Sequence, residues 1–178
     1  MEKASFAAGC FWGVEGVFEQ LTGVTSVVSG YSGGDAASAN YETVSTGTTG
    51  HAESVLIHYD PQIISYGTLL KIFFSVAHNP TELNYQGPDH GSQYRSAIFY
   101  ENPEQKKTAE DYIALLTREK IFPGPIVTQI VPLKKFYPAE DYHQNFMAKN
   151  PNYPYIVMWD RPKVQALKQL YPQLIKKN

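Results

Sequence analysis

Hydrophobic positions along the chain follow two periods, one typical of strands and one typical of helices. Short alternating or apolar runs predict strands over residues 3–8, 24–31, 54–59, 96–100 and 127–131. Apolar residues three and four positions apart predict helices over residues 14–21, 66–77, 103–120, 140–148 and 162–170. Gly23 is expected to end the first of these helices as a C-terminal cap. Up to residue 100 the predicted order is strand, helix, strand, strand, helix, strand.

This order predicts an α+β fold of the split βαβ, ferredoxin-like kind, with helices on one face of a mainly antiparallel sheet. The two-layer core is expected to be followed by a C-terminal extension of coil and helix. Residues 35–53 and 78–94 are polar and rich in turn-forming residues, which predicts two long loops. The 178 residues can bury one core and contain no repeat or linker, so we expect a single domain over residues 1–178.

Composition narrows the functional classes. The chain is 43% hydrophobic and 18% charged, as is usual for a soluble globular protein. A net charge of -2 gives no attraction for a phosphate backbone, so nucleic acid is not an expected partner. No apolar run is long enough to span a membrane and no signal-peptide pattern begins the chain, so a cytoplasmic location is expected, although an already processed chain would look the same.

The single cysteine, Cys10, lies between Gly9 and two large aromatic residues in the stretch GCFWG. It follows a predicted strand and precedes a predicted helix. The positive end of the helix dipole is expected to stabilise a thiolate there and to lower the thiol pKa from about 8.5. Gly9 and Gly13 leave room for a substrate. The alternative is an inert buried thiol, which is the commoner fate of a free cysteine.

At GCFWG the chain resembles the A-type peptide methionine sulfoxide reductases. Five further blocks match in the family's order, namely GYSGG at 30–34, YETVSTGTTGHAE at 41–53, YDP at 59–61, QGPDHGSQYRS at 86–96 and FYPAEDYHQ at 136–144. The resemblance implies the fold predicted above and the reduction of the S epimer of methionine sulfoxide, free or in proteins, to methionine. This reaction repairs oxidised proteins.

The resemblance also implies roles for individual residues. Cys10 matches the nucleophile that attacks the sulfoxide sulfur, which leaves methionine and a Cys10 sulfenic acid. Glu53 matches the acid that protonates the sulfoxide oxygen. To donate near neutral pH it needs a pKa well above about 4.3, which desolvation and a nearby thiolate would supply. Tyr41 and Tyr94 match two phenols that hydrogen-bond the same oxygen.

Further side chains match the substrate pocket of this family. Phe11 and Trp12 are similar to the apolar wall that holds the substrate methyl group, and Asp89 is similar to a carboxylate that positions the substrate. For these residues core packing and loop capping are the ordinary alternatives. His51 could orient Glu53 or be a plain loop histidine. A supporting part is expected for His143 and Gln144.

Two kinds of departure from the family pattern stand out. Asn79 and Tyr85 replace an Asp and an Arg of the family in the loop before Asp89. The tail from Asp160 to Asn178 has no second, resolving cysteine. An external thiol, which could be glutathione, a glutaredoxin or thioredoxin, is therefore expected to reduce Cys10. We expect no bound cofactor, no metal site and a monomer, since one Cys and five scattered His do not make a zinc site.

Two other functional classes remain open on the residues alone. A non-catalytic module could keep an aromatic pocket that binds methionine or its sulfoxide. A hydrolase could use Cys10 with His51 or His143 on acyl substrates. A carboxylic acid and two phenols directed at one oxygen fit a sulfoxide better than an acyl group.

Overall fold

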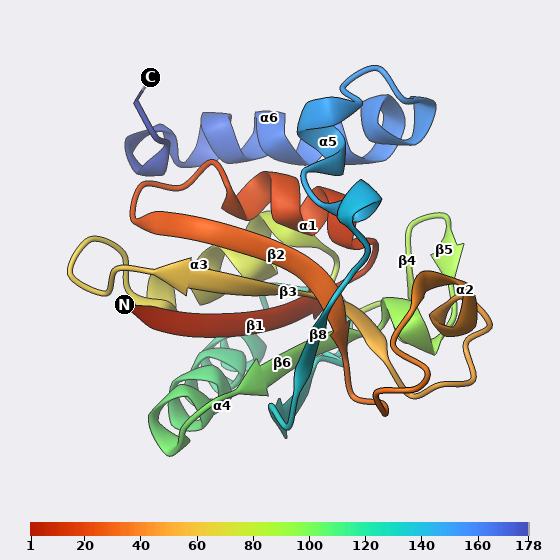
Figure 1. The fold of residues 1–178 in the computed structure, drawn as a ribbon. Helices are drawn as coiled ribbons and strands as arrows, with labels where there is room; N and C mark the ends of the chain where they lie inside the picture. Colours follow the sequence, from red (N-terminus) through yellow and green to blue (C-terminus); the bar gives the residue numbers. More distant parts are fainter. Residues whose placement is uncertain (178) are drawn as a thin grey trace.

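A computed structural model describes residues 1–177, and its centre is a mixed six-stranded sheet with the strand order β7-β6-β1-β3-β2-β8 (Figure 1). The strands are β1 Glu2–Ala8, β2 Val24–Ser32, β3 Ala52–Tyr59, β6 Ser96–Tyr100, β7 Gln129–Pro132 and β8 Phe136–Pro138. Strands β4 Tyr85–Gln86 and β5 Asp89–His90 form a separate hairpin. Strand β7 pairs with β6 in parallel, and the other neighbours in the sheet are antiparallel.

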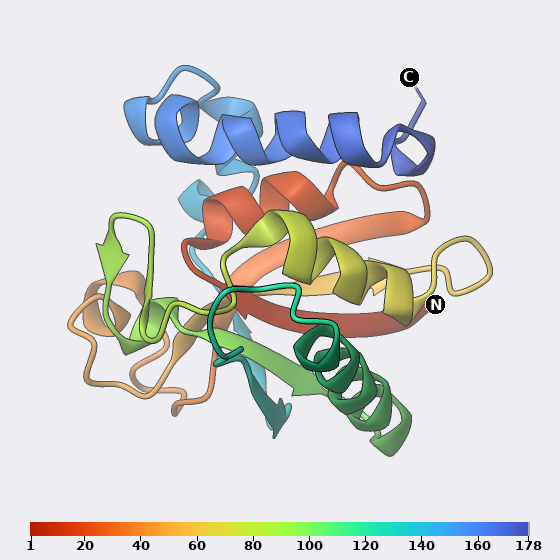
Figure 2. The ribbon, with the colours of Figure 1, turned by 180° about the vertical axis from the view of Figure 1, so that it is seen from behind.

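The helices cover the sheet and its ends. They are α1 Phe11–Phe18, α2 Tyr41–Val44, α3 Tyr66–Ile72, α4 Pro103–Arg118, α5 Phe146–Lys149 and α6 Arg161–Leu170. Helices α1 and α3 lie over one face of the sheet, and α6 lies across the outer side of α1 (Figures 1 and 2). The α+β class is confirmed. No helix in residues 1–177 combines the length and the apolar composition needed to cross a bilayer.

Strand β1 shows how the sequence places the main core. Successive side chains of a strand point to opposite faces, so Ala4, Phe6 and Ala8 all face helices α1 and α3. The ring of Phe6 is fully buried and lies 5.7 Å from the ring of Phe18 and 4.9 Å from that of Phe73, measured between centroids. The main core therefore lies between the sheet and the two helices that precede and follow the central strands.

Several short helical turns end or interrupt the predicted helices. The predicted helix 66–77 is α-helical to Ile72 and continues as a π-helical turn, η1 Phe73–Ala77. The predicted helix 140–148 is a 3-10 turn, η3 Asp141–His143, followed by α5, because Asn145 between them has a left-handed φ of 55°. The remaining turns are the 3-10 turns η2 Ser92–Tyr94 and η5 Pro172–Leu174 and the π-helical turn η4 Ile156–Asp160.

Sequence predictions of local structure were wrong at Gly23 and in the loops 35–53 and 78–94, the second of which contains β4, β5 and η2. Helix α1 ends at Phe18, with Glu19 as its cap, so Gly23 does not cap it. With φ at 95°, Gly23 instead turns the chain into β2, and its carbonyl accepts a hydrogen bond from the Asp60 amide. The predicted loop 35–53 contains α2, because the Asn40 side chain accepts a hydrogen bond from the Thr43 amide at 2.9 Å and caps this short helix.

We expect Phe6→Ala to lower the free energy of unfolding by about 3–5 kcal/mol, because it opens a cavity among the rings of Phe18, Tyr66 and Phe73. Urea unfolding followed by circular dichroism measures the change. Ile121→Ala is the matched control, because Ile121 is 59% exposed, and its effect should stay within about 0.5 kcal/mol. Equal effects of the two substitutions would contradict the core described here.

Candidate active site

Cys10 and Glu53 meet where β1 turns into α1. Cys10 is the N-cap residue of α1, and Glu53 lies on β3, which pairs with β1. The Phe11 amide donates a hydrogen bond to Glu53 Oε1 at 3.1 Å. Gly9 makes the turn with φ at 86°, and a side chain there would overlap Gln86. The carboxyl group is thus fixed to the amide that directly follows the thiol-bearing residue.

Glu53 is suited to carry a proton at neutral pH. It is 1% exposed, and burial raises the pKa of its carboxyl from 4.5 to about 8. The hydrogen bond from Phe11 lowers this pKa, and the charge of Asp89 raises it. The pKa of Glu53 shifts in the direction expected from the sequence, but the neighbouring charge that raises it is that of Asp89 and not that of the Cys10 thiolate. Glu53 therefore remains largely protonated at pH 7.

The pKa of Cys10 shifts in the direction opposite to the sequence prediction. Burial raises it well above its ordinary value, and the charges of Glu53, Asp160 and Asp89 raise it further. Only the Trp12 amide, in the first turn of α1, acts in the lowering direction. The lowering effect of one short helix end on the pKa of Cys10 does not offset the rise caused by desolvation and by three acidic neighbours. Because Glu53 bears no charge when protonated, its protonation removes one of the effects that oppose a thiolate.

Tyr41 and Tyr94 share the surroundings of Cys10 and Glu53. Tyr41 begins α2 and Tyr94 ends η2, so the two long polar segments of the sequence each supply one phenol. Burial raises the pKa of Tyr41 to about 12, and the charges of Glu53 and Cys10 add to the rise. Burial and the charge of Glu53 likewise raise the pKa of Tyr94. Both hydroxyls therefore stay protonated and remain hydrogen-bond donors at neutral pH.

Phe11 and Trp12 occupy different environments. Phe11 is fully buried, and its ring packs between the rings of Tyr31 and His143. Trp12 is partly exposed, stacks on Phe146 with a centroid distance of 3.8 Å, and donates from Nε1 to His143 Nδ1 at 2.9 Å. Phe11 is thus a core residue beside the site, whereas Trp12 is partly exposed and its ring is held by Phe146 and His143.

Asp89 lies on β5 and accepts a hydrogen bond from the hydroxyl group of Tyr155. The Tyr155 ring also meets the Trp12 ring edge-on at 5.7 Å. Sequence reasoning did not single out Tyr155, since it lies beyond the last matched block. The clustering of tyrosines and prolines between residues 136 and 155 was the signal that could have found it.

The departures Asn79 and Tyr85 are accommodated by the loop that holds Asp89. The backbone amide of Asn79 donates to Gln86 Oε1 at 3.0 Å, and Gln86 Nε2 donates to the backbone carbonyl of Asn79 at 2.6 Å. The Tyr85 ring stacks on that of His90 with a centroid distance of 5.3 Å. This pair of hydrogen bonds and the stacked rings fix the hairpin on which Asp89 lies.

The polar residues expected to support the site hold the backbone. His51 Nδ1 accepts from the Gly34 amide at 3.1 Å and Nε2 donates to the Asp35 carbonyl at 2.7 Å, so His51 does not bind Glu53. Gln144 bonds the Ser29 backbone on both its amide and its carbonyl. Within residues 1–177 no group of three or more His, Cys, Asp and Glu side chains is placed to hold a metal ion.

Asp160 is a buried acid that sequence reasoning missed. It is fully buried, and neither carboxylate oxygen has a hydrogen-bond partner within the described chain. It packs against Gly13 in the first turn of α1, and Lys163 Nζ lies 3.9 Å away. Burial raises its pKa from 3.8 to about 7. Asp160 therefore belongs to the electrostatic surroundings of Cys10 although it is 150 residues away in sequence.

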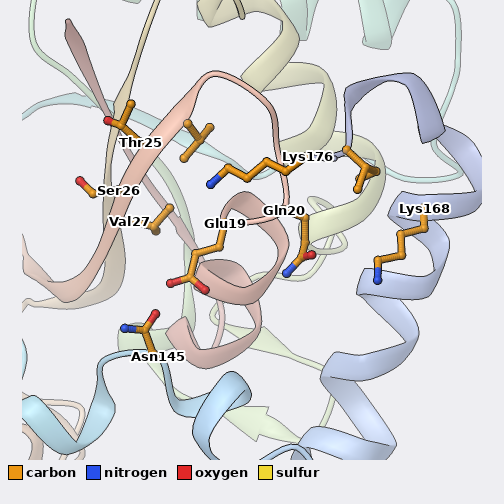
Figure 3. A pocket seen from close by; sticks show the side chains of 10 residues that line it. Glu19, Gln20, Thr25, Ser26, Val27, Asn145, Lys168 and Lys176 are labelled. Carbon is orange, nitrogen blue, oxygen red and sulfur yellow. The ribbon is translucent and has the colours of Figure 1, made fainter. Parts of the chain in front are cut away.

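Two cavities differ in their relation to these residues. One of about 250 Å³ has Cys10 in its lining, together with Gln86, Tyr155, Trp159 and Lys163. A larger polar pocket of about 510 Å³ lies at the other end of α1, where Glu19 faces Asn145 (Figure 3). None of the site residues predicted from the sequence lines this second pocket. The smaller cavity is the one that reaches the thiol.

We expect the stability difference between the wild-type protein and Glu53→Gln to depend on pH. The raised pKa means that protonated Glu53 favours the folded state, so its contribution is complete below pH 4.5 and is lost as the pH rises to about 8. Urea unfolding of both proteins from pH 4.5 to 9 measures this: wild type should lose stability relative to the variant up to about pH 8 and no further. Parallel curves would contradict the raised pKa.

Comparisons with known proteins agree on one family. The family model described as peptide methionine sulfoxide reductase matches residues 2–174. The peptide methionine sulfoxide reductase MsrA 2 of Mesorhizobium japonicum is 61% identical over 173 residues, which cover 97% of this chain and 89% of that protein.

Solved structures of yeast Mxr1 have a similar fold. The reduced form from Saccharomyces cerevisiae has a TM-score of 0.78 and 32% identity, covering 85% of this chain and 87% of that one. Mxr1 in complex with Trx2 has a TM-score of 0.55 at 21% identity, covering 82% and 84%, and supports the fold alone. From the family model and the relatives together, the chain belongs to the peptide methionine sulfoxide reductase family.

Proposed function

We propose that this protein reduces the S epimer of methionine sulfoxide, free and in oxidised proteins, through a sulfenic acid on Cys10. The observation that carries the proposal is the hydrogen bond from the Phe11 amide to Glu53, which holds a largely protonated acid beside the residue that bears the thiol. A sulfoxide needs a nucleophile at sulfur and a proton at oxygen, and this arrangement can supply both.

In the first step the Cys10 thiolate attacks the sulfoxide sulfur while Glu53 gives its proton to the oxygen. The oxygen passes to the Cys10 sulfur, which is oxidised by two electrons, and methionine leaves. Tyr41 and Tyr94 donate hydrogen bonds to the same oxygen as negative charge develops on it. Preorganised donors of this kind in a dry site contribute about 3 kcal/mol each.

Substrate binding is assigned to the side chains around this pair. Trp12, with Phe11 behind it, is proposed to hold the terminal methyl group, because stacking on Phe146 and the bond to His143 fix the Trp12 ring. Asp89 is proposed to position the substrate, and Tyr155 already forms a hydrogen bond with its carboxylate. An acyl substrate for Cys10 with His51 or His143 is disfavoured, since His51 bonds to backbone groups and His143 accepts from Trp12.

Reduction of the Cys10 sulfenic acid is assigned to an external thiol, with no bound cofactor. Cys10 is the single cysteine of the 178 residues, so a second thiol has to come from another molecule. Yeast Mxr1, whose reduced form is 32% identical to this chain, has also been solved in complex with Trx2, and on that basis we propose a thioredoxin-type reductant ahead of glutaredoxin and glutathione. The monomeric state and the cytoplasmic location stay predictions.

We also propose that the core of the fold is ferredoxin-like. Strands β6, β1, β3 and β2 lie side by side in that order and pair antiparallel. With α1 and α3 as the connecting helices, this supports a ferredoxin-like, split βαβ core. The part of the chain after β7 would then be the C-terminal extension, which adds Trp12's partners to the site.

Incubation with the separated S and R epimers of a methionine sulfoxide peptide, with dithiothreitol as reductant, tests the proposed function. We expect methionine to form from the S epimer only, and Cys10→Ser to abolish its formation. Mass spectrometry of the wild-type protein after S-epimer treatment without reductant should detect one added oxygen on Cys10. Turnover of the R epimer, or binding of sulfoxide without turnover, would refute the proposal.

Glu53→Gln and Tyr94→Phe separate the acid from the hydrogen-bond donors. Loss of a general acid should lower kcat by about 10²- to 10⁴-fold, and loss of one hydroxyl donor by about 10²-fold. Steady-state kinetics with the S epimer measure both, and KM should change little because neither side chain is assigned to the methyl group. An unchanged kcat in Glu53→Gln would remove the acid role.

A further inference from the structure

The cavity that reaches Cys10 opens between two separate parts of the chain. One wall comes from the loop before and around β4, with Asn79, Glu82, Gly87 and Pro88, and the other comes from Trp159 in η4 and Lys163 in α6. Gly87 lies against the ring of Trp159, since a Cβ on Gly87 would be 3.5 Å from that ring. The opening therefore has a loop on one side and η4 on the other.

Exposed apolar residues line this cavity or directly follow or precede residues that line it, since Leu83 follows Glu82 and Met158 precedes Trp159. Met158 is 68% exposed, Trp159 is 39% exposed and both belong to η4, while Leu83 on the facing loop is 64% exposed. Pro88 is also exposed and lines the cavity. We call these four residues the apolar rim. Side chains of this size that gather at one exposed site mark a place where a partner binds, rather than the scatter usual on protein surfaces.

The chemistry of Cys10 indicates which partner has to come to this opening. This step rests on the proposed function. Once Cys10 carries the oxygen, a second thiol has to come within bonding distance of its Sγ, and none of the other 177 residues is a cysteine that could supply it. The cavity with Cys10 in its lining includes Pro88 and Trp159 of the apolar rim. A protein that delivers the thiol through this cavity thus has to contact the rim.

The charges at the opening favour a protein over a small charged thiol. A tripeptide thiol such as glutathione carries two carboxylates, but the cavity lining includes the acid Glu82 and a single cation, Lys163. Asp160 lies 3.9 Å from the Lys163 ammonium and already neutralises part of its charge. The opening therefore offers apolar area and little net positive charge.

We propose that Leu83, Pro88, Met158 and Trp159 form the docking surface for a protein dithiol of the thioredoxin type, whose attacking sulfur is surrounded by apolar surface. A thiolate of the partner attacks Cys10 Sγ, the S–O bond breaks, and the oxygen leaves as water after it takes up protons. The second partner thiolate then attacks the partner's sulfur in this mixed disulfide and releases Cys10 as a thiolate. The dithiol loses two electrons and the sulfenic acid gains two.

Kinetics with two reductants test the docking surface. Turnover of the S-epimer substrate is measured against the concentration of bacterial thioredoxin, recycled by its reductase and NADPH, and separately with dithiothreitol. In Leu83→Glu and Met158→Glu the KM for thioredoxin should rise about tenfold or more, because a charge replaces buried apolar contact. The dithiothreitol-supported rate should stay within about twofold of wild type, since that small dithiol needs only the cavity and no docked rim.

Ile63→Glu is the matched control, because Ile63 is 59% exposed and belongs to the loop between β3 and α3, and that loop lies on the opposite side of the molecule from β4 and β5 (Figure 1). It should leave both rates unchanged. Unchanged KM for thioredoxin in both rim variants would overturn the docking surface, as would a wild-type protein that uses millimolar glutathione well and thioredoxin poorly. Failure of the proposed function itself would show separately, as no turnover with dithiothreitol.

Discussion

The hydrogen bond between the Phe11 amide and Glu53 is the contact on which the site depends. It joins Phe11, the residue after the thiol-bearing Cys10, to the carboxyl group of Glu53 on β3, and both residues are buried. A carboxylic acid remains protonated at neutral pH only when water is kept away from it. The sheet and helix α1 keep water away, and the antiparallel pairing of β1 with β3 places the acid beside the nucleophile. The pairing of β1 with β3 and the protonation of Glu53 therefore depend on the same requirement, that this part of the sheet stays buried.

The exclusion of water that keeps Glu53 protonated also raises the pKa of the nucleophile, Cys10. Burial disfavours the Cys10 thiolate, and the surrounding carboxyl groups of Glu53, Asp89 and Asp160 disfavour it further. The raised pKa values of both groups mean that Glu53 keeps its proton at neutral pH and that Cys10 gives up its own with difficulty. A sulfoxide that enters such a site meets the acid in the form that can donate. The remaining requirement, a thiolate, is helped by any step that keeps Glu53 neutral.

The sequence was sufficient for features that depend on local pattern and insufficient for those that depend on contacts across the fold. Alternating apolar residues located the strands, and matched blocks indicated which side chains would gather. Helix α2 and strand β8 were missed, because the first depends on the Asn40 cap and the second on pairing with β2. The pKa of Cys10 was predicted in the wrong direction, because only the lowering effect of the adjacent helix end was evident from the sequence. The opposing charges come from residues 53, 89 and 160, whose approach no local pattern reveals.

The packing of Asp160 on Gly13 has a consequence for how the molecule is made. During synthesis Cys10 leaves the ribosome about 150 residues before η4 and α6 do. Until they dock on α1, the thiol lacks the wall formed by Tyr155 and Trp159 as well as the buried carboxyl behind it. A nascent or truncated chain would hold its sulfur in wetter, less acidic surroundings, where ordinary thiol chemistry competes with the reaction of the mature site. The docking of η4 and α6 on α1 is thus the step at which a common reactive group acquires its selectivity.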